Sequence, residues 1–183
     1  MPEDSSRFSF RNPVAAEIGA VAGLCLVGLL ARAIVYVRIE DVLHADAAVQ
    51  GIIARHILGG ELQLFTYGIS HLGTLQAHWI ALCFALFGDS TFVLKWAAGT
   101  ESLLLVPAVY LLAREMAGGD RRAALLAGLL TAVGPLYLIE WSLRARGGNV
   151  QVVIFSAFAL WLTLRACRIG GTAAAADRPG AVR

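Results

Sequence analysis

The run of residues from Val14 to Val37 contains only two charged side chains, Glu17 and Arg32. At ~1.5 Å of helix per residue, such a run is roughly 36 Å long, which is enough to cross the hydrocarbon core of a bilayer with some tilt. Lipid cannot satisfy backbone polar groups, so a crossing segment must be helical. The run therefore predicts a transmembrane helix. We expect Glu17 and Arg32, which lie near its two ends, to extend toward the lipid headgroups.

Three further apolar runs predict membrane crossings, at residues 92–116, at residues 123–141 and, more briefly, at residues 150–166. The chain is 58% hydrophobic and 15% charged, with a mean hydropathy of +0.69. This composition excludes a soluble domain with a single buried core. The predicted class is an all-α integral membrane protein with about four transmembrane helices and two interfacial helices.

The interfacial helices are predicted in the loop formed by residues 38–91, which carries most of the side chains suited to chemistry. Residues 47–58 place Val49, Ile53 and Ile57 at helical spacing on one side, and two glycines follow. Residues 74–87 are apolar, but they provide only about 21 Å of helix, which is too short for a crossing. Both segments are therefore expected to lie along the membrane surface.

Basic residues are distributed unevenly between the two sides of this four-span layout. One side carries Arg7, Arg11, Arg114, Arg121, Arg122, Arg165, Arg168, Arg178 and Arg183, and the other carries Arg38, Arg55, Lys95, Arg144 and Arg146. The side richer in arginine is expected to be cytoplasmic. This predicts a cytoplasmic N-terminal segment (residues 1–13), a transmembrane domain (14–169) whose first loop (38–91) is extracytoplasmic, and a disordered tail (170–183). The expected location is the plasma membrane.

The turn before the last predicted helix is a candidate anion site. It reads Arg144-Ala145-Arg146-Gly147-Gly148-Asn149. Guanidinium groups bind phosphate in bidentate fashion, glycines allow close approach of the backbone, and a helix N-terminus presents free N–H groups. In the alternative interpretation, the arginines extend to the membrane surface, the glycines only turn the chain, and Arg144 pairs with Glu140 four residues earlier.

Two carboxylates, Asp46 and Glu101, are candidates for a special role, and Asp46 has two interpretations. Asp46 lies on the same predicted side as the basic turn, where it could accept a proton from a hydroxyl group that attacks a sugar. Alternatively, it stabilises the first turn of the helix that follows. Glu101 lies near the middle of the second crossing, where an unpaired charge is costly, so we expect it to face the bundle and to have a partner.

The ordered succession of motifs resembles the N-terminal portion of the GT-C membrane glycosyltransferases. It comprises HADAAVQGIIARHILGGELQLFTYGISHLGTLQAHWIALCFALFGDSTFVLKWAAG, then YLLARE, RRAALLAGLLTAVGPLYL and SLRARGGN. Within that superfamily it is most similar to the family-39 group, which includes protein O-mannosyltransferases, aminoarabinose transferases and RgtA/B/C/D-like enzymes. The resemblance extends from about residue 14 to residue 161. It implies a first helix, a long extracytoplasmic loop with two interfacial helices, and a multi-span bundle.

The resemblance also implies roles for individual residues. Asp46 matches the first-loop aspartate that serves as catalytic base, and Lys95, Arg144 and Arg146 match basic positions near the lipid phosphate. Tyr67 matches a loop element of the family. Gln76, Asn149 and Gln151 occupy further matched positions, Gln76 and Gln151 where relatives often carry glutamate. These eight residues form the predicted site, with Asp46 as catalytic residue and the other seven as substrate-binding residues.

An amide keeps the hydrogen bonding of a carboxylate but accepts no proton. The four histidines are scattered, and Cys25, Cys83 and Cys167 show no paired spacing, so no metal site and no disulfide are predicted. A divalent cation is left open as a cofactor. The expected partners are membrane lipid, a polyprenyl-phosphate sugar donor and a partner chain that completes the bundle; nucleic acid is not expected.

The leading hypothesis is a glycosyltransferase that moves a sugar from a polyprenyl-phosphate donor to an extracytoplasmic acceptor. Relatives commonly continue through more spans, so the chain is expected to be a truncated product, half of a split enzyme, or a remnant that binds lipid carrier. The alternative function is a catalytically inactive membrane protein that binds the lipid carrier or assembles with a partner. A small transporter that uses Glu101 and Arg32 is a weaker third hypothesis, because no helix repeats a polar face.

Overall fold

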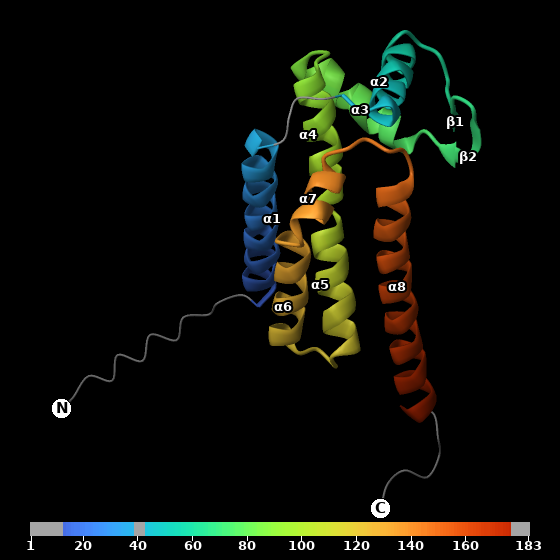
Figure 1. Cartoon of the computed structure of the whole chain (residues 1–183). Helices are drawn as coiled ribbons and strands as arrows, with labels where there is room; N and C mark the ends of the chain where they lie inside the picture. Colours follow the sequence, from blue (N-terminus) through green and yellow to red (C-terminus); the bar gives the residue numbers. More distant parts are fainter. Residues whose placement is uncertain (1–12, 39–42, 177–183) are drawn as a thin grey trace, which may run out of the picture.

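The computed structural model describes residues 13–38 and 43–176, and these are almost entirely helical (Figure 1). The elements are α1 (Pro13–Arg38), α2 (Ala45–Leu58), β1 (Phe65–Thr66), β2 (Ile69–Gly73), α3 (Leu75–Phe87), α4 (Thr91–Ser102), α5 (Leu105–Met116), α6 (Arg121–Ala132), α7 (Leu136–Ser142) and α8 (Asn149–Ala176). The predicted all-α membrane class is confirmed. Of the predicted cytoplasmic segment, residues 1–12 lie outside the described residues.

Three helical segments are long and apolar enough to cross a membrane: Val14–Val37, Thr91–Met116 and Asn149–Gly170. The pair α6 and α7 makes a fourth if it counts as one span, although its halves are bent by 70°. Pro135 explains this bend, because proline lacks an N–H donor and disfavours helical geometry in the residue before it. The prediction of about four spans is confirmed, but the third is broken rather than continuous.

All the long helices run roughly side by side, and the short elements gather at one end (Figure 1). We call this the loop end; it carries α2, the β1–β2 hairpin, α3 and the turn of residues 143–148. The connection between α5 and α6 lies at the opposite end, where α1 begins. Helix α5 packs against α6 and α8, and α1 packs against α6. Residues 43–91 and the basic turn therefore meet at one end, as the four-span layout predicted.

The hairpin was not predicted from the sequence. Strands β1 and β2 are antiparallel and joined by a tight turn in which Gly68 has a φ of +74°, a conformation that favours glycine. Thr74 Oγ1 donates to the Gln63 carbonyl oxygen at 2.5 Å and closes the hairpin at its base. The strands are short and mostly exposed, so they carry little of the periodic apolar signal that marks a strand.

A hydrophobic core joins α2, α3 and α4 at the loop end. Ile80 of α3 is fully buried, and Ala54 of α2 and Ala98 of α4 belong to the same cluster of buried side chains. Complete burial of a side chain such as Ile80 stabilises a fold by about 1.5–3 kcal/mol. Arg55 of α2 also pairs with Asp89, and the hydrogen bond and charge of that carboxylate raise the pKa of Arg55. Both predicted interfacial helices are thus found, and they pack on each other and on α4.

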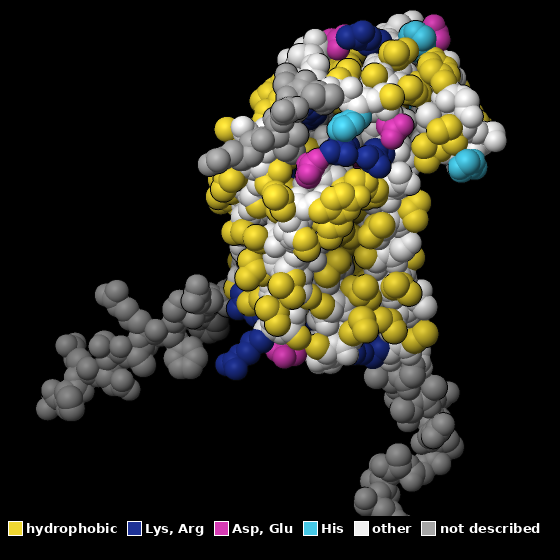
Figure 2. Space-filling model, viewed as in Figure 1, with side chains coloured by type: hydrophobic (Ala, Val, Ile, Leu, Met, Phe, Trp, Pro, Cys, Tyr) yellow, Lys and Arg dark blue, Asp and Glu magenta, His cyan; other side chains and the backbone are white. Residues whose placement is uncertain are grey.

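A belt of hydrophobic side chains surrounds the bundle on the face drawn in Figure 2, with charged side chains above and below it. Large apolar residues such as Ile34, Leu130 and Val152 are more than half exposed there. A soluble protein rarely leaves so large an apolar surface uncovered. The belt is therefore the surface that faces lipid.

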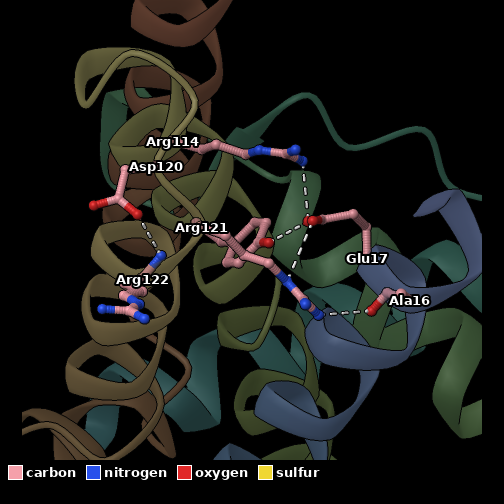
Figure 3. A network of polar contacts seen from close by, with 7 residues as sticks. Ala16, Glu17, Arg114, Asp120, Arg121 and Arg122 are labelled. Atoms are coloured by element: carbon pink, nitrogen blue, oxygen red, sulfur yellow. Dashed lines mark hydrogen bonds and ion pairs between the residues drawn. The ribbon is translucent and has the colours of Figure 1, made fainter.

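Glu17 ties three helices together at the opposite end (Figure 3). The Tyr110 hydroxyl donates to its carboxylate, Arg114 Nη1 lies at 3.0 Å and Arg121 Nε at 3.3 Å. Arg32, in contrast, is inside the bundle, with 5% of its surface exposed. The prediction that Arg32 extends to the headgroups was wrong, because helix periodicity does not show which partners neighbouring helices bring.

The boundary predicted at residue 170 also differs from the structure. Helix α8 continues to Ala176, and residues 177–183 lie outside the described residues. The segment from Gly170 contains a run of alanines, and alanine has the highest helix propensity of all residues. That propensity outweighs the two glycines at the start of the segment.

We predict that Glu17→Gln lowers the free energy of unfolding by about 1–3 kcal/mol, because two arginines lose their ion-pair partner and one hydrogen bond weakens. The measurement is thermal unfolding of the purified protein in detergent. Glu61→Gln, which changes an exposed carboxylate in the loop, serves as the control and should leave the melting temperature unchanged. Equal melting temperatures for both variants and the unmodified protein would contradict the role assigned to Glu17.

Candidate functional site

Among the residues described at the loop end, one carboxylate is buried: Glu101, which is 7% exposed at the end of α4. It accepts a hydrogen bond from Gln76 Nε2 of α3 at 2.9 Å and another from Gln151 Nε2 of α8. The prediction that Glu101 faces the bundle and has a partner is confirmed. Its partners are the two glutamines that the resemblance matched to glutamate positions, so two N–H donors surround one negative charge.

Gln76 extends this network to the basic turn. Its Oε1 accepts the backbone N–H of Gly147 at 2.7 Å, and its side chain is fully buried. Gly147 has a φ of +72°, and a Cβ there would lie 2.5 Å from Leu72 of the hairpin. Glycine is therefore required both by the backbone conformation and by the space. The turn that carries the two arginines is thus fixed by a hydrogen bond and a close contact.

The two arginines of the turn have different surroundings. Arg144 is paired with Glu140, as the alternative interpretation predicted. The guanidinium carbon of Arg146 lies 5.8 Å from the centroid of the Trp141 ring, and its Nε is buried without a hydrogen-bond partner. Unpaired buried donors are uncommon in native proteins and cost about 1–3 kcal/mol. Arg146 is held in place but has a donor available to a ligand.

Asp46 lies in the first turn of α2 and is exposed. Among the described residues, none forms a hydrogen bond or ion pair with it, so it does not cap the helix through its side chain. Gln50 follows one turn later on the same side of α2, and its Nε2 lies 3.3 Å from the position of a Cβ on Gly147. Asp46 is therefore one helical turn away from the residue of α2 that lies against the basic turn. Figure 2 shows acidic, basic and histidine side chains next to one another just above the hydrophobic belt.

The remaining predicted residues lie around this centre. Asn149 starts α8, and its Nδ2 donates to the Arg146 carbonyl oxygen at 3.3 Å. Lys95 Nζ lies 5.7 Å from the centroid of the Tyr36 ring, on the side of α1. Tyr67 lies in the hairpin turn, and its hydroxyl is 2.5 Å from Nδ1 of His56 in α2. These contacts of Lys95 and Tyr67 lie away from the hydrogen bonds of Glu101.

A cavity of about 540 Å³ opens beside Glu101, between α3, α4 and α8. Its walls are mainly apolar, and Glu101, Gln151 and His78 supply the polar groups. Gln151 Oε1 is buried and has no hydrogen-bond partner among the described residues. The cavity has the size and character of a site for a hydrocarbon chain or small ligand.

Two features of the site were missed by sequence reasoning. The first is the pairing of Glu101 with Gln76 and Gln151, and the second is Gln50, which lies against the turn. A buried amide leaves a signal in the sequence only when it interrupts an apolar helix face, as Gln50 does in α2. Within the described ranges, no group of three or more histidine, cysteine or acidic side chains is placed to hold a metal ion.

The sequence matches a family model described as dolichyl-phosphate-mannose-protein mannosyltransferase over residues 73–174. This is more than half of the chain. The chain belongs to this family. No curated protein and no solved structure matched it.

Membership of the mannosyltransferase family implies glycosyltransferase activity with a polyprenyl-phosphate-linked sugar donor. The matched residues extend from the end of β2 through α3 into α8, so they include Gln76, Glu101 and the basic turn. Asp46 and Tyr67 lie before the matched part. The matched part therefore covers α3 to α8 and does not include α1 or α2.

We predict that Glu101→Gln lowers the free energy of unfolding by about 1–3 kcal/mol, because one of the two glutamine donors then faces an N–H group instead of an acceptor. Thermal unfolding of Glu101→Gln, Gln151→Ala and the double variant should show non-additive effects, since the two residues share one hydrogen bond. Gln63→Ala, which removes a partly exposed amide in the loop, is the control. Strictly additive effects would contradict the network.

We predict that Gly147→Ala is much more damaging than Gly148→Ala. The first combines a positive φ with a Cβ 2.5 Å from Leu72, whereas the second has ordinary backbone geometry and its nearest atom at 3.2 Å. Strain of this kind costs about 1–3 kcal/mol. The melting temperatures of the two variants measure the difference. Similar values would mean that the turn is not fixed as the structure shows.

Proposed function

We propose that this protein transfers a sugar from a polyprenyl-phosphate donor to an acceptor bound at the loop end. The observation that carries the proposal is the position of the basic turn. Gly147 lies against Gln50 of α2, which is one helical turn from Asp46. The side chain of Gln76 accepts the backbone N–H of Gly147 and so holds the basic turn. An exposed carboxylate and a turn with two arginines thus lie at the same end of the molecule, although they are about a hundred residues apart in the sequence.

The phosphate of the donor is assigned to the turn. Arg146 has a free Nε donor, and Arg144 uses one nitrogen for Glu140, which leaves its other donors for phosphate oxygens. The first turn of α8 adds backbone N–H groups and the positive end of the helix dipole. Lys95 is proposed as a further cation at this end. In the proposal, Gln76 holds the turn and Gln151 holds Glu101. Tyr67 and Asn149 contact the sugar or acceptor.

In the proposed reaction, Asp46 accepts the proton of the acceptor hydroxyl while the oxygen of that hydroxyl attacks the anomeric carbon of the sugar. A bond forms between that oxygen and the anomeric carbon as the bond from this carbon to the phosphate oxygen breaks. The bonding electrons leave with polyprenyl phosphate, whose negative charge is stabilised by Arg144 and Arg146. A single displacement of this kind inverts the anomeric configuration.

The proposal includes an orientation. With the loop end outside the cytoplasm, Arg114, Arg121, Arg122 and Arg168 face the cytoplasm, in agreement with the positive-inside rule. The start of α1 then lies on the cytoplasmic side of the plasma membrane, and residues 14–169 form the transmembrane domain. The acceptor is accordingly a molecule outside the cytoplasm.

The first test is binding of a polyprenyl-phosphate sugar to the purified protein in detergent. We expect Arg144→Ala/Arg146→Ala to weaken binding at least tenfold, because the phosphate loses its cations. Arg165→Ala is a matched control, since Arg165 lies over Trp161 at 5.7 Å much as Arg146 lies over Trp141 at 5.8 Å. Unchanged binding in the double variant would contradict the assignment of the phosphate.

Transfer of labelled sugar separates the enzyme from a protein that only binds the lipid carrier. Asp46→Asn should reduce transfer by about 100- to 10,000-fold, the usual contribution of a general base, and should leave donor binding unchanged. Its exposed position without hydrogen-bond partners among the described residues means that folding should be unaffected. Binding without transfer in the unmodified protein would favour the non-enzymatic alternative.

A further inference from the structure

Arg32 is a buried arginine whose charge is not balanced by a carboxylate. Its Nε donates to Ser102 Oγ at 2.9 Å and its Nη1 to the Gly28 carbonyl oxygen at 3.0 Å. Among the described residues, no acidic group lies within ion-pair distance of it. A charge buried inside a membrane bundle is expensive and usually marks a functional position.

The surrounding helices leave room for this side chain. A Cβ on Gly28 would lie 3.3 Å from Arg32 Nη1, and a Cβ on Gly99 would lie 3.9 Å from Arg32 Cδ. Arg32 also lines a second cavity of about 440 Å³ between α1, α5, α6, α7 and α8. Its walls are mainly apolar, with Leu130 and Val153 among them. The guanidinium group therefore lies at the edge of a space suited to a hydrocarbon chain.

The polar groups of this cavity select the chemistry of a ligand. Three hydroxyl groups line it, but Ser102, Thr131 and Ser142 each donate to a carbonyl oxygen of their own helix. The donors that remain are those of Arg32 and the indole N–H of Trp141, neither of which is fully used within the described chain. A ligand must therefore bring hydrogen-bond acceptors with negative charge.

We propose that this cavity binds a lipid phosphate with a single hydrocarbon chain, at a site separate from the basic turn. The phosphate pairs with Arg32 and the chain occupies the apolar part of the cavity. Arg32 is six residues before the end of α1 at Arg38, which places it roughly 9 Å below that end. This depth is shallow enough for a phosphate to reach from the membrane surface.

The test uses farnesyl phosphate as the probe, with farnesol and inorganic phosphate as comparisons, and native mass spectrometry of the purified protein in detergent. Arg32→Gln should weaken binding of one farnesyl phosphate molecule at least tenfold. Val153→Trp, which fills the cavity and leaves Arg32 in place, should do the same. Arg165→Gln is the control and should bind as the unmodified protein does. Farnesol and inorganic phosphate should bind weakly to all of them.

The two phosphate sites can be told apart by stoichiometry. Arg144→Ala/Arg146→Ala should keep the Arg32 site, so a failure of the proposed transferase leaves this result unchanged. The proposal is overturned if neither Arg32→Gln nor Val153→Trp weakens binding, or if farnesol binds as tightly as farnesyl phosphate. It is also overturned if only the double variant loses the ligand. A melting temperature lowered by Arg32→Gln, with phosphate binding unchanged, would assign Arg32 a structural role instead.

Discussion

The hydrogen bonds that Glu101 accepts from Gln76 and Gln151 are the constraint on which the loop end depends. A carboxylate inside a membrane bundle must find donors, because lipid offers none. Here the donors come from helices before and after α4, so that α3, α4 and α8 are fixed at one point. The second end of the Gln76 amide then holds Gly147. Glu101, which does no chemistry in the proposed reaction, thereby sets through Gln76 the position of the turn that would bind phosphate.

Much of the helical framework could be predicted because lipid imposes a length on each crossing. The limits of α1, the shortness of α3 and the meeting of residues 43–91 with the basic turn all follow from apolar runs and the distribution of arginines. The partners of Glu17 and Arg32 could not be predicted. Both looked like headgroup anchors from their positions in α1, whereas Arg114 and Arg121 in one case, and Ser102 in the other, are supplied by helices distant in the sequence.

The same distinction applies to the site. The basic character of residues 144–149 and the isolated charge of Glu101 were visible in the sequence, as was the exposed acid Asp46. Their relation was not, because it depends on Leu72 of an unpredicted hairpin and on Gln50, a buried amide within an amphipathic helix. The spatial arrangement arises where the hairpin, α2 and the turn pack together, and no single segment encodes that contact.

Arg32 and Arg146 illustrate a conflict between stability and binding. Each keeps hydrogen-bonding capacity that the protein itself leaves unused, Arg146 through a buried Nε and Arg32 through a charge without an acidic partner. An apolar residue of similar size would fill either position without the desolvation cost of a charge. Trp141 stacks under Arg146 and is also one of the residues that line the cavity of Arg32. A phosphate that approaches from the membrane would offset the cost of keeping either charge in the protein.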